Sequence, residues 1–287
     1  MKLYIIYDSY QYSVNRWFAE HLLECAADCS LDAELIISED LTTGISGGEA
    51  YALYNGQHLT KNSAVIMRTI SPFLSEFLET AGFSVFNSAE ISRICNDKRL
   101  SYLKAADAGA KIIDTQFADN ITEIKLPFPY VIKTPDGHGG KEIFPVSNLS
   151  EKLSAEDFFA GRKKMLAQEF SPVIGKDIRF YCLGGSFLKA VERSSAGGFK
   201  SNFSLGGTAS AYEPNEEELS LLYSLLNVFS KTPDFIGVDF LPGLPGENDK
   251  PTLYFNEFED VVGTRTLYSV YNIDAARLFI DYITKMI

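Results

Sequence analysis

The sequence predicts an α/β unit at the N-terminus followed by α+β structure, that is, an α/β plus α+β protein. Three observations lead to this prediction. Short apolar strands alternate with amphipathic helices over about the first 95 residues, an order typical of a parallel sheet. The later chain is rich in strands, with glycine turns typical of antiparallel pairs. The length of 287 residues also exceeds the ~150 residues of an average domain.

Residues 1–95 are expected to form a Rossmann-like unit. Its first helix carries apolar residues at helical spacing. No G-x-G-x-x-G follows the first strand, so no dinucleotide site is predicted. The expected elements are a strand at 3–7, a helix at 13–27, a strand at 33–37, a hairpin turn at Asn55-Gly56, a strand at 64–67, a helix at 72–81 and a strand at 83–86.

Residues 96–166 are expected to form a second unit, a helix followed by strands. Gly109 is placed to cap the helix. The near capping box Ser154-Ala155-Glu156-Asp157 predicts that a further helix begins there. The expected elements are a helix at 97–108 and strands at 111–114, 129–134, 142–146 and 165–170.

Residues 167–287 are expected to form a third, sheet-rich unit. Gly184-Gly185 lies between two strand patterns, which predicts a hairpin. The expected elements are strands at 177–183 and 186–194, a helix at 215–231, strands at 235–241 and 252–258 joined by a loop, and a closing helix at 272–286.

The composition excludes several functions. Lys and Arg number 26 against 38 Asp and Glu, a net charge of −12, and nucleic acids or anionic membranes need a positive field. Apolar runs stop well short of the ~20 residues of a membrane span. The four cysteines form no disulfide framework, and no cysteine–histidine pair has zinc-ligand spacing, so a reducing, cytoplasmic location is expected. With three histidines, a histidine-based metal site is not predicted.

A glycine-rich turn joins two predicted strands at Lys133–Lys141. Glycines allow backbone N–H groups to approach phosphate oxygens, and a lysine adds a point charge. The Walker pattern is absent, and a strand follows where that motif needs a helix. A purely structural hairpin turn is the alternative interpretation.

Carboxylates gather in two predicted strands near the C-terminus. Asp239 lies in an otherwise apolar strand, while Glu257 and Glu259 are two residues apart and so face the same way. If the strands pair, three carboxylates converge. Buried like charges are costly unless a cation neutralises them, and Mg²⁺ takes carboxylate oxygens. A solvated sheet edge is the alternative.

Arginines also lie within strand or turn patterns. Arg179 and Arg193 are on the two arms of the predicted hairpin, while Arg68 follows an apolar strand and Asn202 precedes Gly206-Gly207. The guanidinium fork suits carboxylate and phosphate oxygens. Each arginine alone is more typical of a surface ion pair.

Together these segments resemble the ATP-grasp superfamily, and most closely its RimK-like ligases, which include the enzyme that adds glutamates to a ribosomal protein. The resemblance implies an ATP-grasp fold behind an N-terminal Rossmann-like (pre-ATP-grasp) domain. Nine short motifs agree in order and spacing over nearly the whole chain. The motifs are Ala64–Arg68, Asn96–Lys98, Val131–Lys133 with its glycine turn, Gln168–Phe170, Gly175–Arg179, Ala190–Arg193, Phe199–Gly207, Gly237–Asp239 and Asn256–Gly263.

The resemblance implies how ATP would be bound. Two lysines would contact the phosphates under a glycine-rich lid, and a hinge would hold adenine through backbone groups. The residues implied are Lys98 and Lys133 at the phosphates, Gly137, His138, Gly139 and Gly140 in the lid, Gln168, Glu169 and Phe170 at the hinge, and Asp177 at the ribose.

The resemblance also implies metal, catalytic and substrate residues. Three acids would hold two Mg²⁺ ions, and arginines with an amide would face the γ-phosphate and the substrate carboxylate. The residues implied are Asp239, Glu257 and Glu259 for metal, Arg179, Arg193 and Asn202 for catalysis, and Arg68, Arg179 and Arg265 for substrate.

The sequence departs from the family pattern at several positions. Glu259 replaces the asparagine that usually ends the metal motif, Val261-Val262-Gly263 replaces Ser-Pro-Gly, and Leu205 replaces an arginine of the ribosomal-protein ligase. These positions surround the substrate side, so a substrate other than a ribosomal protein is compatible with the resemblance.

The resulting hypothesis is an ATP-dependent carboxylate–amine ligase that forms an amide or peptide bond through an acyl phosphate. Its partners would be a carboxylate and an amine, each an amino acid, a peptide or another small molecule. A non-catalytic or regulatory ATP-binding protein and a different ATP-grasp chemistry are the alternatives. Related ligases often form dimers or tetramers, so a homo-oligomer is compatible with this hypothesis.

Overall fold

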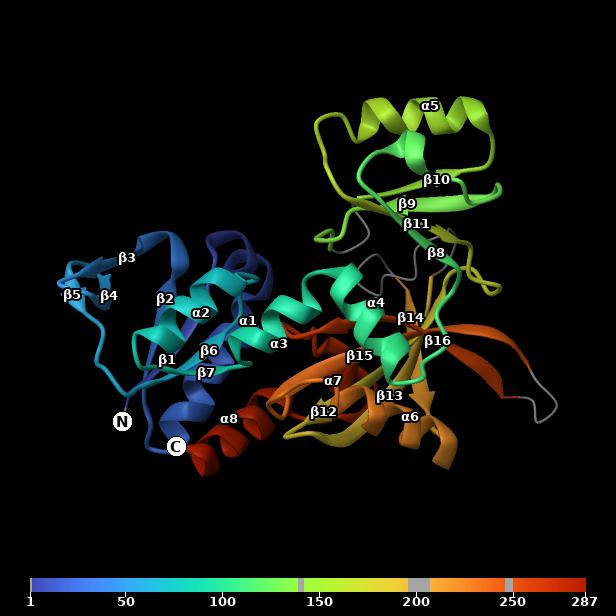
Figure 1. The fold of residues 1–287 in the computed structure, drawn as a ribbon. Helices are drawn as coiled ribbons and strands as arrows, with labels where there is room; N and C mark the ends of the chain where they lie inside the picture. The colour runs from blue at the N-terminus through green and yellow to red at the C-terminus, as the bar shows by residue number, and fades with distance from the viewer. Residues whose placement is uncertain (1, 139–141, 196–206, 246–249) are drawn as a thin grey trace.

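The computed structural model describes residues 2–138, 142–195, 207–245 and 250–287. Figure 1 shows a parallel sheet with its helices at the left, a small lobe at the top and a larger sheet with helices at the lower right. Strands in the described residues form four sheets, in the orders β2-β1-β6-β7, β3-β4-β5, β10-β9-β11-β8 and β14-β13-β12-β15-β16.

The N-terminal sheet is parallel, as predicted. Alternate residues of its first strand enter different cores, because successive strand side chains point to opposite faces. Leu3 and Ile5 pack with α1 and α8, while Tyr4 and Ile6 pack with α2. Helices from both ends of the chain therefore cover this sheet. Its elements are β1 (Lys2–Tyr7), α1 (Ser9–Asp28), β2 (Asp32–Ile37), β6 (Ala64–Met67), α2 (Pro72–Thr80), β7 (Ser84–Phe86) and, from the C-terminus, α8 (Ala275–Met286).

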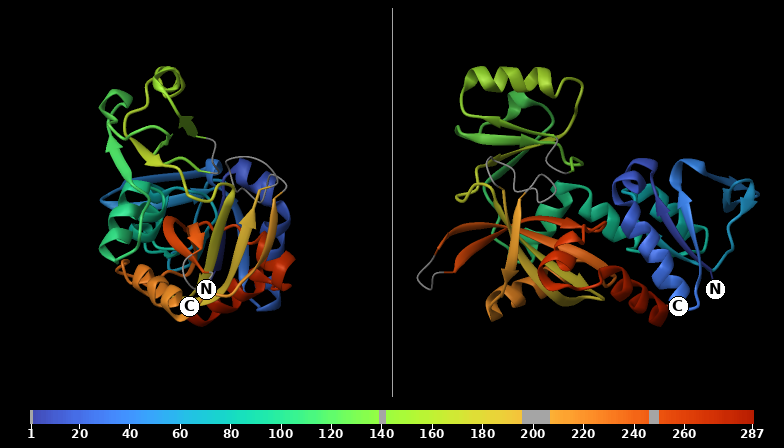
Figure 2. Two further views of the ribbon diagram at one scale, coloured as in Figure 1. Left: turned by 90° about the vertical axis from the view of Figure 1, so that its right-hand side faces the viewer. Right: turned by 180° about the vertical axis from the view of Figure 1, so that it is seen from behind.

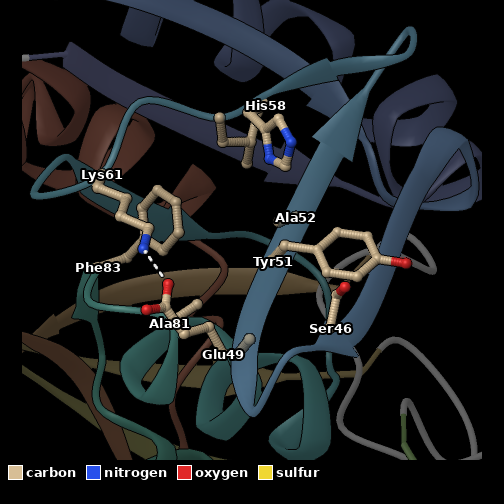
Figure 3. A pocket seen from close by; sticks show the side chains of 10 residues that line it. Ser46, Glu49, Tyr51, Ala52, His58, Lys61, Ala81 and Phe83 are labelled. Carbon is tan, nitrogen blue, oxygen red and sulfur yellow. Dashed lines mark hydrogen bonds and ion pairs between the residues drawn. The ribbon is translucent and has the colours of Figure 1, made fainter.

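The chain between β2 and β6 forms a second sheet, which is antiparallel. The sequence analysis did not predict this sheet. Asn55 and Gly56 both have positive φ, 52° and 76°, and they join β4 directly to β5 as the predicted turn requires. This sheet lines a cavity of about 190 Å³, where Lys61 faces Glu49 at 3.2 Å (Figure 3). No residue predicted for the functional site lines this cavity. The elements are η1 (Ser38–Asp40), β3 (Leu41–Ser46), β4 (Glu49–Tyr54) and β5 (Gln57–His58).

Two helices connect this unit to the rest. The predicted helix at 97–108 is α4 (Lys98–Asp107), and a further helix, α3 (Ala89–Cys95), precedes it. Ile91 and Ile94 of α3 and Tyr102 of α4 pack into the core of the five-stranded sheet. The domain boundaries at 95 and 166 stay predictions.

The upper lobe is an antiparallel sheet covered by one helix (Figure 1). The expected strand at 111–114 is wrong: this segment crosses between lobe and body, and its Lys111 carbonyl accepts from the Phe255 amide. The helix start expected at Ser154 is also wrong, because Asn148 caps the helix earlier by accepting from the Glu151 amide. The elements are β8 (Thr115–Ala118), η2 (Ile121–Glu123), β9 (Tyr130–Lys133), β10 (Ile143–Val146), α5 (Leu149–Phe158) and β11 (Met165–Glu169).

The large sheet is antiparallel and carries α6 on one face. The predicted helix at 215–231 ends earlier, at Leu226. The expected closing helix at 272–286 begins later than predicted. Asn272 has a left-handed φ of 53° and ends the preceding helix, so that α7 and α8 are separate helices. The elements are β12 (Lys176–Leu183), β13 (Ser186–Ser194), β14 (Thr208–Tyr212), α6 (Glu216–Leu226), β15 (Phe235–Pro245), β16 (Pro251–Glu259), α7 (Arg265–Tyr271) and α8. None of the helices in the described ranges has the length and apolar character needed to cross a membrane.

Candidate functional site

Strand alternation places the predicted acids and arginines on one face of the large sheet. In β12, Ile178 and Phe180 pack into the core that contains α6, so Asp177 and Arg179 point to the opposite face. The register then brings distant residues together. Asp239 of β15 lies opposite both Arg179 and Glu257. The pairing of the two acidic strands, on which convergence of the three carboxylates depends, is therefore present.

Asp239 is the centre of an ion-pair network. It is 1% exposed and accepts two hydrogen bonds from Arg179, at 2.7 Å from Nε and 2.6 Å from Nη2. Arg193 Nη2 also donates to it, at 2.8 Å. Burial alone raises the pKa of a carboxyl, but the two guanidinium groups outweigh burial and hold the pKa of Asp239 below its usual value. Asp239 is thus an anion that fixes two arginines.

The arginines link Asp239 to two further acids. Arg193 Nε donates to Asp177 Oδ1 at 2.8 Å, and a second guanidinium nitrogen contacts the other oxygen. Burial nevertheless raises the pKa of Asp177. Arg179 Nη1 forms an ion pair with Glu259. The predicted ribose residue, catalytic arginines and metal acids are therefore parts of one charged layer.

Two buried lysines approach this layer from α4 and β9. Lys98 is 8% exposed; its ammonium donates to the Gly137 carbonyl and lies 3.5 Å from Glu257 Oε2. Lys133 is 7% exposed and donates to Gln168 Oε1 at 2.7 Å. Burial lowers the pKa of Lys133 to about 8. Both lysine side chains are buried, and the charge of Glu257 acts on each of them.

Tyr102 is a residue of this site that the sequence analysis missed. Its hydroxyl lies 3.5 Å from Lys133 Nζ and accepts from Gln168 Nε2 at 3.2 Å. A usable signal was present, because Tyr102 is four residues after Lys98 and so shares its face of the helix. Tyr102 therefore contacts both Lys133 and Gln168, the first residue of the predicted adenine hinge.

The predicted hinge segment lies at the end of β11. Gln168 is buried and also donates to Thr115 Oγ1 at 2.9 Å. The Glu169 amide donates to the Asp114 carbonyl at 3.0 Å, and Phe170 follows directly. The backbone of this segment connects the upper lobe to the large sheet, which is where a hinge is expected.

The lid turn is described in part. A Cβ at Gly137 would lie 2.6 Å from Thr134 Oγ1, so a larger residue there would displace the Thr134 side chain from its hydrogen bond to Glu142. His138 is exposed. Gly139 and Gly140 of the predicted lid, like the predicted catalytic residue Asn202, lie outside the described residues.

Arg68 and Arg265 differ in their surroundings. Arg68 is 6% exposed; it donates to the Val262 carbonyl at 3.1 Å and stacks over the Phe18 ring at 5.2 Å. Its Nε is buried without a hydrogen-bond partner among the described residues, and it forms no ion pair with their acids. Arg265 is exposed and donates to Val14 and Asn15 on α1. A buried guanidinium without a carboxylate is suited to an incoming anion.

The three acids, Asp239, Glu257 and Glu259, offer only oxygen atoms as ligands, and oxygen is the donor that a hard divalent cation prefers. The side chains of Glu257 and Glu259 are 30% and 35% exposed, so their oxygens are accessible. Asp239 can ligate only through lone pairs that its two arginines leave free. The Arg179 guanidinium lies between Asp239 and Glu259, and the ligand atoms of the three acids do not all come within 4.8 Å of one another. The donor set suits Mg²⁺.

Comparison with known proteins assigns the chain to a family. A family model for the RimK-like ATP-grasp domain matches residues 106–283. The glutamate–LysW ligase of Sulfurisphaera tokodaii is 25% identical over 243 residues, covering 79% of this chain and 83% of that protein. Human beta-citrylglutamate synthase B is 24% identical over 276 residues, covering 90% and 70%. The chain belongs to the RimK-like ATP-grasp family.

Solved structures agree on the fold. The VanG D-Ala:D-Ser ligase of Enterococcus faecalis superposes with a TM-score of 0.76 at 16% identity, covering 100% of this chain and 99% of that one. A RimK domain ATP-grasp protein of Sphaerobacter thermophilus gives 0.73 at 16% identity, covering 99% and 100%. The ATP-grasp fold predicted from the sequence is therefore confirmed. The predicted ATP-dependent carboxylate–amine ligase is confirmed by the family match and by relatives that are glutamate ligases.

ATP and Mg²⁺ are the cofactors of this class of ligase. One structural neighbour, the ATP-grasp ligase PsnB with a phosphomimetic precursor, holds Mg and ADP; it covers 99% of this chain and 98% of that one with a TM-score of 0.68 at 12% identity. The predicted use of ATP with Mg²⁺ is thus confirmed at the level of the class.

Proposed function

We propose that this chain activates a carboxylate with ATP and transfers the acyl group to an amine, releasing ADP and phosphate. The observation that carries the proposal is that two buried lysines lie beside the acidic strands, although these residues are spread over positions 98–259. Lys98 Nζ is 3.5 Å from Glu257 Oε2, the charge of Glu257 also acts on Lys133, and Glu257 lies opposite Asp239. Cations beside metal-binding oxygens suit a triphosphate.

The proposed chemistry proceeds in two steps. A carboxylate oxygen attacks the γ-phosphorus of ATP, the bond to ADP breaks, and an acyl phosphate forms. The amine nitrogen then attacks the acyl carbon and loses a proton to solvent or to the departing phosphate, which carries that carboxylate oxygen away. Two Mg²⁺ ions held by Asp239, Glu257 and Glu259 would neutralise phosphate charge when bound.

The chain's own residues would position the two anions. Lys98 and Lys133 would hold the ATP phosphates, and Arg193 with Asn202 would face the oxygens that gain charge during transfer. Arg179 pairs with both Asp239 and Glu259, and it would hold these two acids in place beside the substrate carboxylate.

The nucleotide would be enclosed by the upper lobe. The turn of Gly137, His138, Gly139 and Gly140 would cover the phosphates, with adenine at Gln168–Phe170 and Asp177 on the ribose side. Covering the site would exclude water, which would otherwise hydrolyse the acyl phosphate.

An amino acid is the proposed substrate class. The relatives include a glutamate–LysW ligase and a tetrahydromethanopterin:alpha-L-glutamate ligase, so glutamate joined to a carrier or to another small molecule is the first combination to test. Arg68 would hold a carboxylate of the substrate, and Arg265 would lie at the edge of this region. A homo-oligomeric state and a cytoplasmic location remain predictions.

The test of this function is a ligation assay with the full chain. We expect ADP release that requires both a carboxylic acid and an amine, in a panel of amino acids, short peptides and dicarboxylic acids with Mg²⁺ and ATP. The product mass should equal both substrates less one water. ATP binding without substrate-dependent ADP release across the panel would instead favour a non-catalytic ATP-binding protein.

Replacing Arg68 with methionine should weaken use of the carboxylate substrate. We expect its KM to rise about 10- to 100-fold, because hydrogen bonds to charged groups contribute ~1.5–3 kcal/mol and 1.4 kcal/mol corresponds to a factor of ten. Initial rates at varied acid concentration measure this change.

The stability of the Arg68→Met variant shows whether the substitution removes only a substrate contact or also damages the fold. The Arg68→Met chain should unfold at the same or a higher urea concentration than the wild type, since it lacks a buried charge without an acid partner. Arg16→Met, at an exposed ion pair on α1, is the matched control and should leave KM unchanged. An unaltered KM in Arg68→Met would remove this residue from the substrate site.

A further inference from the structure

The junction of α1 and α8 holds a cluster that the proposed ligase chemistry does not use. The two helices pack against each other over one face of the N-terminal sheet (Figure 2). His21 and Cys25 lie four residues apart on α1 and so share a face. Asp274 comes from the start of α8, 253 positions after His21. The sequence analysis found no cysteine–histidine pair with zinc-ligand spacing, but His21 and Cys25 lie one helical turn apart. Only the third member, Asp274, is too distant in sequence for spacing to reveal it.

The side chains of Cys25 and Asp274 both face the Nε2 atom of His21. His21 Nε2 lies 2.8 Å from Asp274 Oδ2 and 3.7 Å from Cys25 Sγ, and the three ligand atoms all lie within 4.8 Å of one another. Tetrahedral zinc with bonds of ~2.0 Å to nitrogen or oxygen and ~2.3 Å to sulfur needs ligand separations of about 3.3–3.5 Å. Small side-chain shifts would meet this requirement.

The surrounding contacts already orient these ligands. The other histidine nitrogen, Nδ1, lies 3.0 Å from Glu24 Oε2, as is usual for a metal-bound histidine. The second oxygen of Asp274 accepts from Tyr268 Oη at 2.9 Å and from the Arg277 amide at 3.0 Å, leaving Oδ2 to face the histidine. The ligand atoms of His21 and Asp274 are therefore each oriented by partners on the other end of the same side chain.

The burial of Cys25 disfavours a nucleophilic cysteine. Cys25 and Glu24 do face different nitrogens of the His21 ring, as the thiol and the carboxylate do in a Cys-His-Asp relay, but the thiol is not accessible to a substrate. Cys25 is 3% exposed, and burial raises the pKa of its thiol to about 11, which disfavours attack on a substrate.

We propose that His21, Cys25 and Asp274 form a zinc site that clamps α8 onto α1, with water as the fourth ligand. The nitrogen, sulfur and oxygen donors suit a borderline-soft ion such as Zn²⁺ and not Mg²⁺. The histidine and aspartate side chains are 24% and 43% exposed, so an ion can enter from solvent.

The chain carries its own reporter for this site. Trp17 is its single tryptophan, and the indole stacks on the His21 ring with centroids 5.2 Å apart. The experiment titrates Co²⁺, then Zn²⁺, into chelator-treated full chain in excess Mg²⁺, which saturates oxygen-only sites. We expect saturable quenching of Trp17 by Co²⁺ together with a thiolate-to-cobalt charge-transfer absorption, and loss of both when Zn²⁺ is added.

Variants decide between this site and adventitious binding. Cys25→Ser should abolish the charge-transfer absorption, while Cys29→Ser, at the residue that caps the C-terminus of α1, should retain it. Glu24→Gln should weaken Zn²⁺ affinity about 10- to 100-fold. Absence of the absorption in the wild type, or its persistence in Cys25→Ser, would overturn the proposal. Ligation activity is not a readout, so this test is independent of the ligase proposal.

Discussion

Replacing Asp239 with asparagine is expected to destabilise the protein by ~3–5 kcal/mol, the usual consequence of breaking a buried ion pair from one side. The variant would leave Arg179 and Arg193 buried without their shared anion. Urea unfolding followed by far-ultraviolet circular dichroism measures this loss as a lower midpoint. Ligation should be lost as well, since both arginines and one candidate metal ligand would be displaced.

A matched control lies on β13, two strands away from Asp239 in the same sheet. Glu192 pairs with Lys176 at 2.7 Å, and its side chain is 29% exposed, so Glu192→Gln should cost no more than ~1 kcal/mol. Equal midpoints for Asp239→Asn and Glu192→Gln would show that Asp239 does not organise the network.

The same carboxylate gives a pH dependence with a definite sign. The pKa of Asp239 is lowered in the folded chain, so its contribution to stability is present above the unfolded pKa of about 3.9. That contribution is lost as the pH falls through the lowered pKa of the folded state. The difference in unfolding free energy between the wild type and Asp239→Asn should therefore disappear in strongly acidic solution.

The second large effect is expected at Glu257, on catalysis and not on stability. Glu257→Gln removes a charge 3.5 Å from the Lys98 ammonium, at a side chain that is 30% exposed. We expect kcat to fall about 10²- to 10³-fold, as when one preorganised electrostatic contact is removed. The urea midpoint should change little. Initial rates of ADP release at saturating substrates measure kcat.

The control for this variant is Glu49→Gln, which changes an exposed glutamate paired with Lys61 in the N-terminal unit. It should retain wild-type kcat. A Glu257→Gln enzyme with near-normal turnover would contradict the assignment of Glu257 to the metal site.

Much of the fold could be predicted because its signals are local. The buried strand Ala64–Met67 and the turn Asn55-Gly56 occur where the sequence places them. The sheet at Leu41–Tyr54 was missed, since a glycine at 44 and polar residues at 42 and 43 weaken its strand pattern. The short helix Ala89–Cys95 was also missed, because its buried face is defined by packing on the large sheet.

The site was predictable in its residue types and not in its pairings. The acids and Lys133 were identified from their places in strand and turn patterns, whereas Lys98 was implied by the family resemblance. The structure places Lys98 beside Glu257, and Glu257 opposite Asp239. The bridge from Asp239 to Arg179 depends on strand register across 60 residues of sequence, which no local pattern specifies. Tyr102 shares the helix face of Lys98 and could have been noticed from its spacing, but its contact with Gln168 depends on tertiary packing.

The central claim is that the chain passes phosphate to a carboxylate before the amine attacks. The most direct test supplies an acid substrate labelled with ¹⁸O in its carboxylate and examines the released phosphate by mass spectrometry. The account predicts one ¹⁸O atom in each phosphate formed with ADP. Unlabelled phosphate, or release of AMP and pyrophosphate, would contradict it.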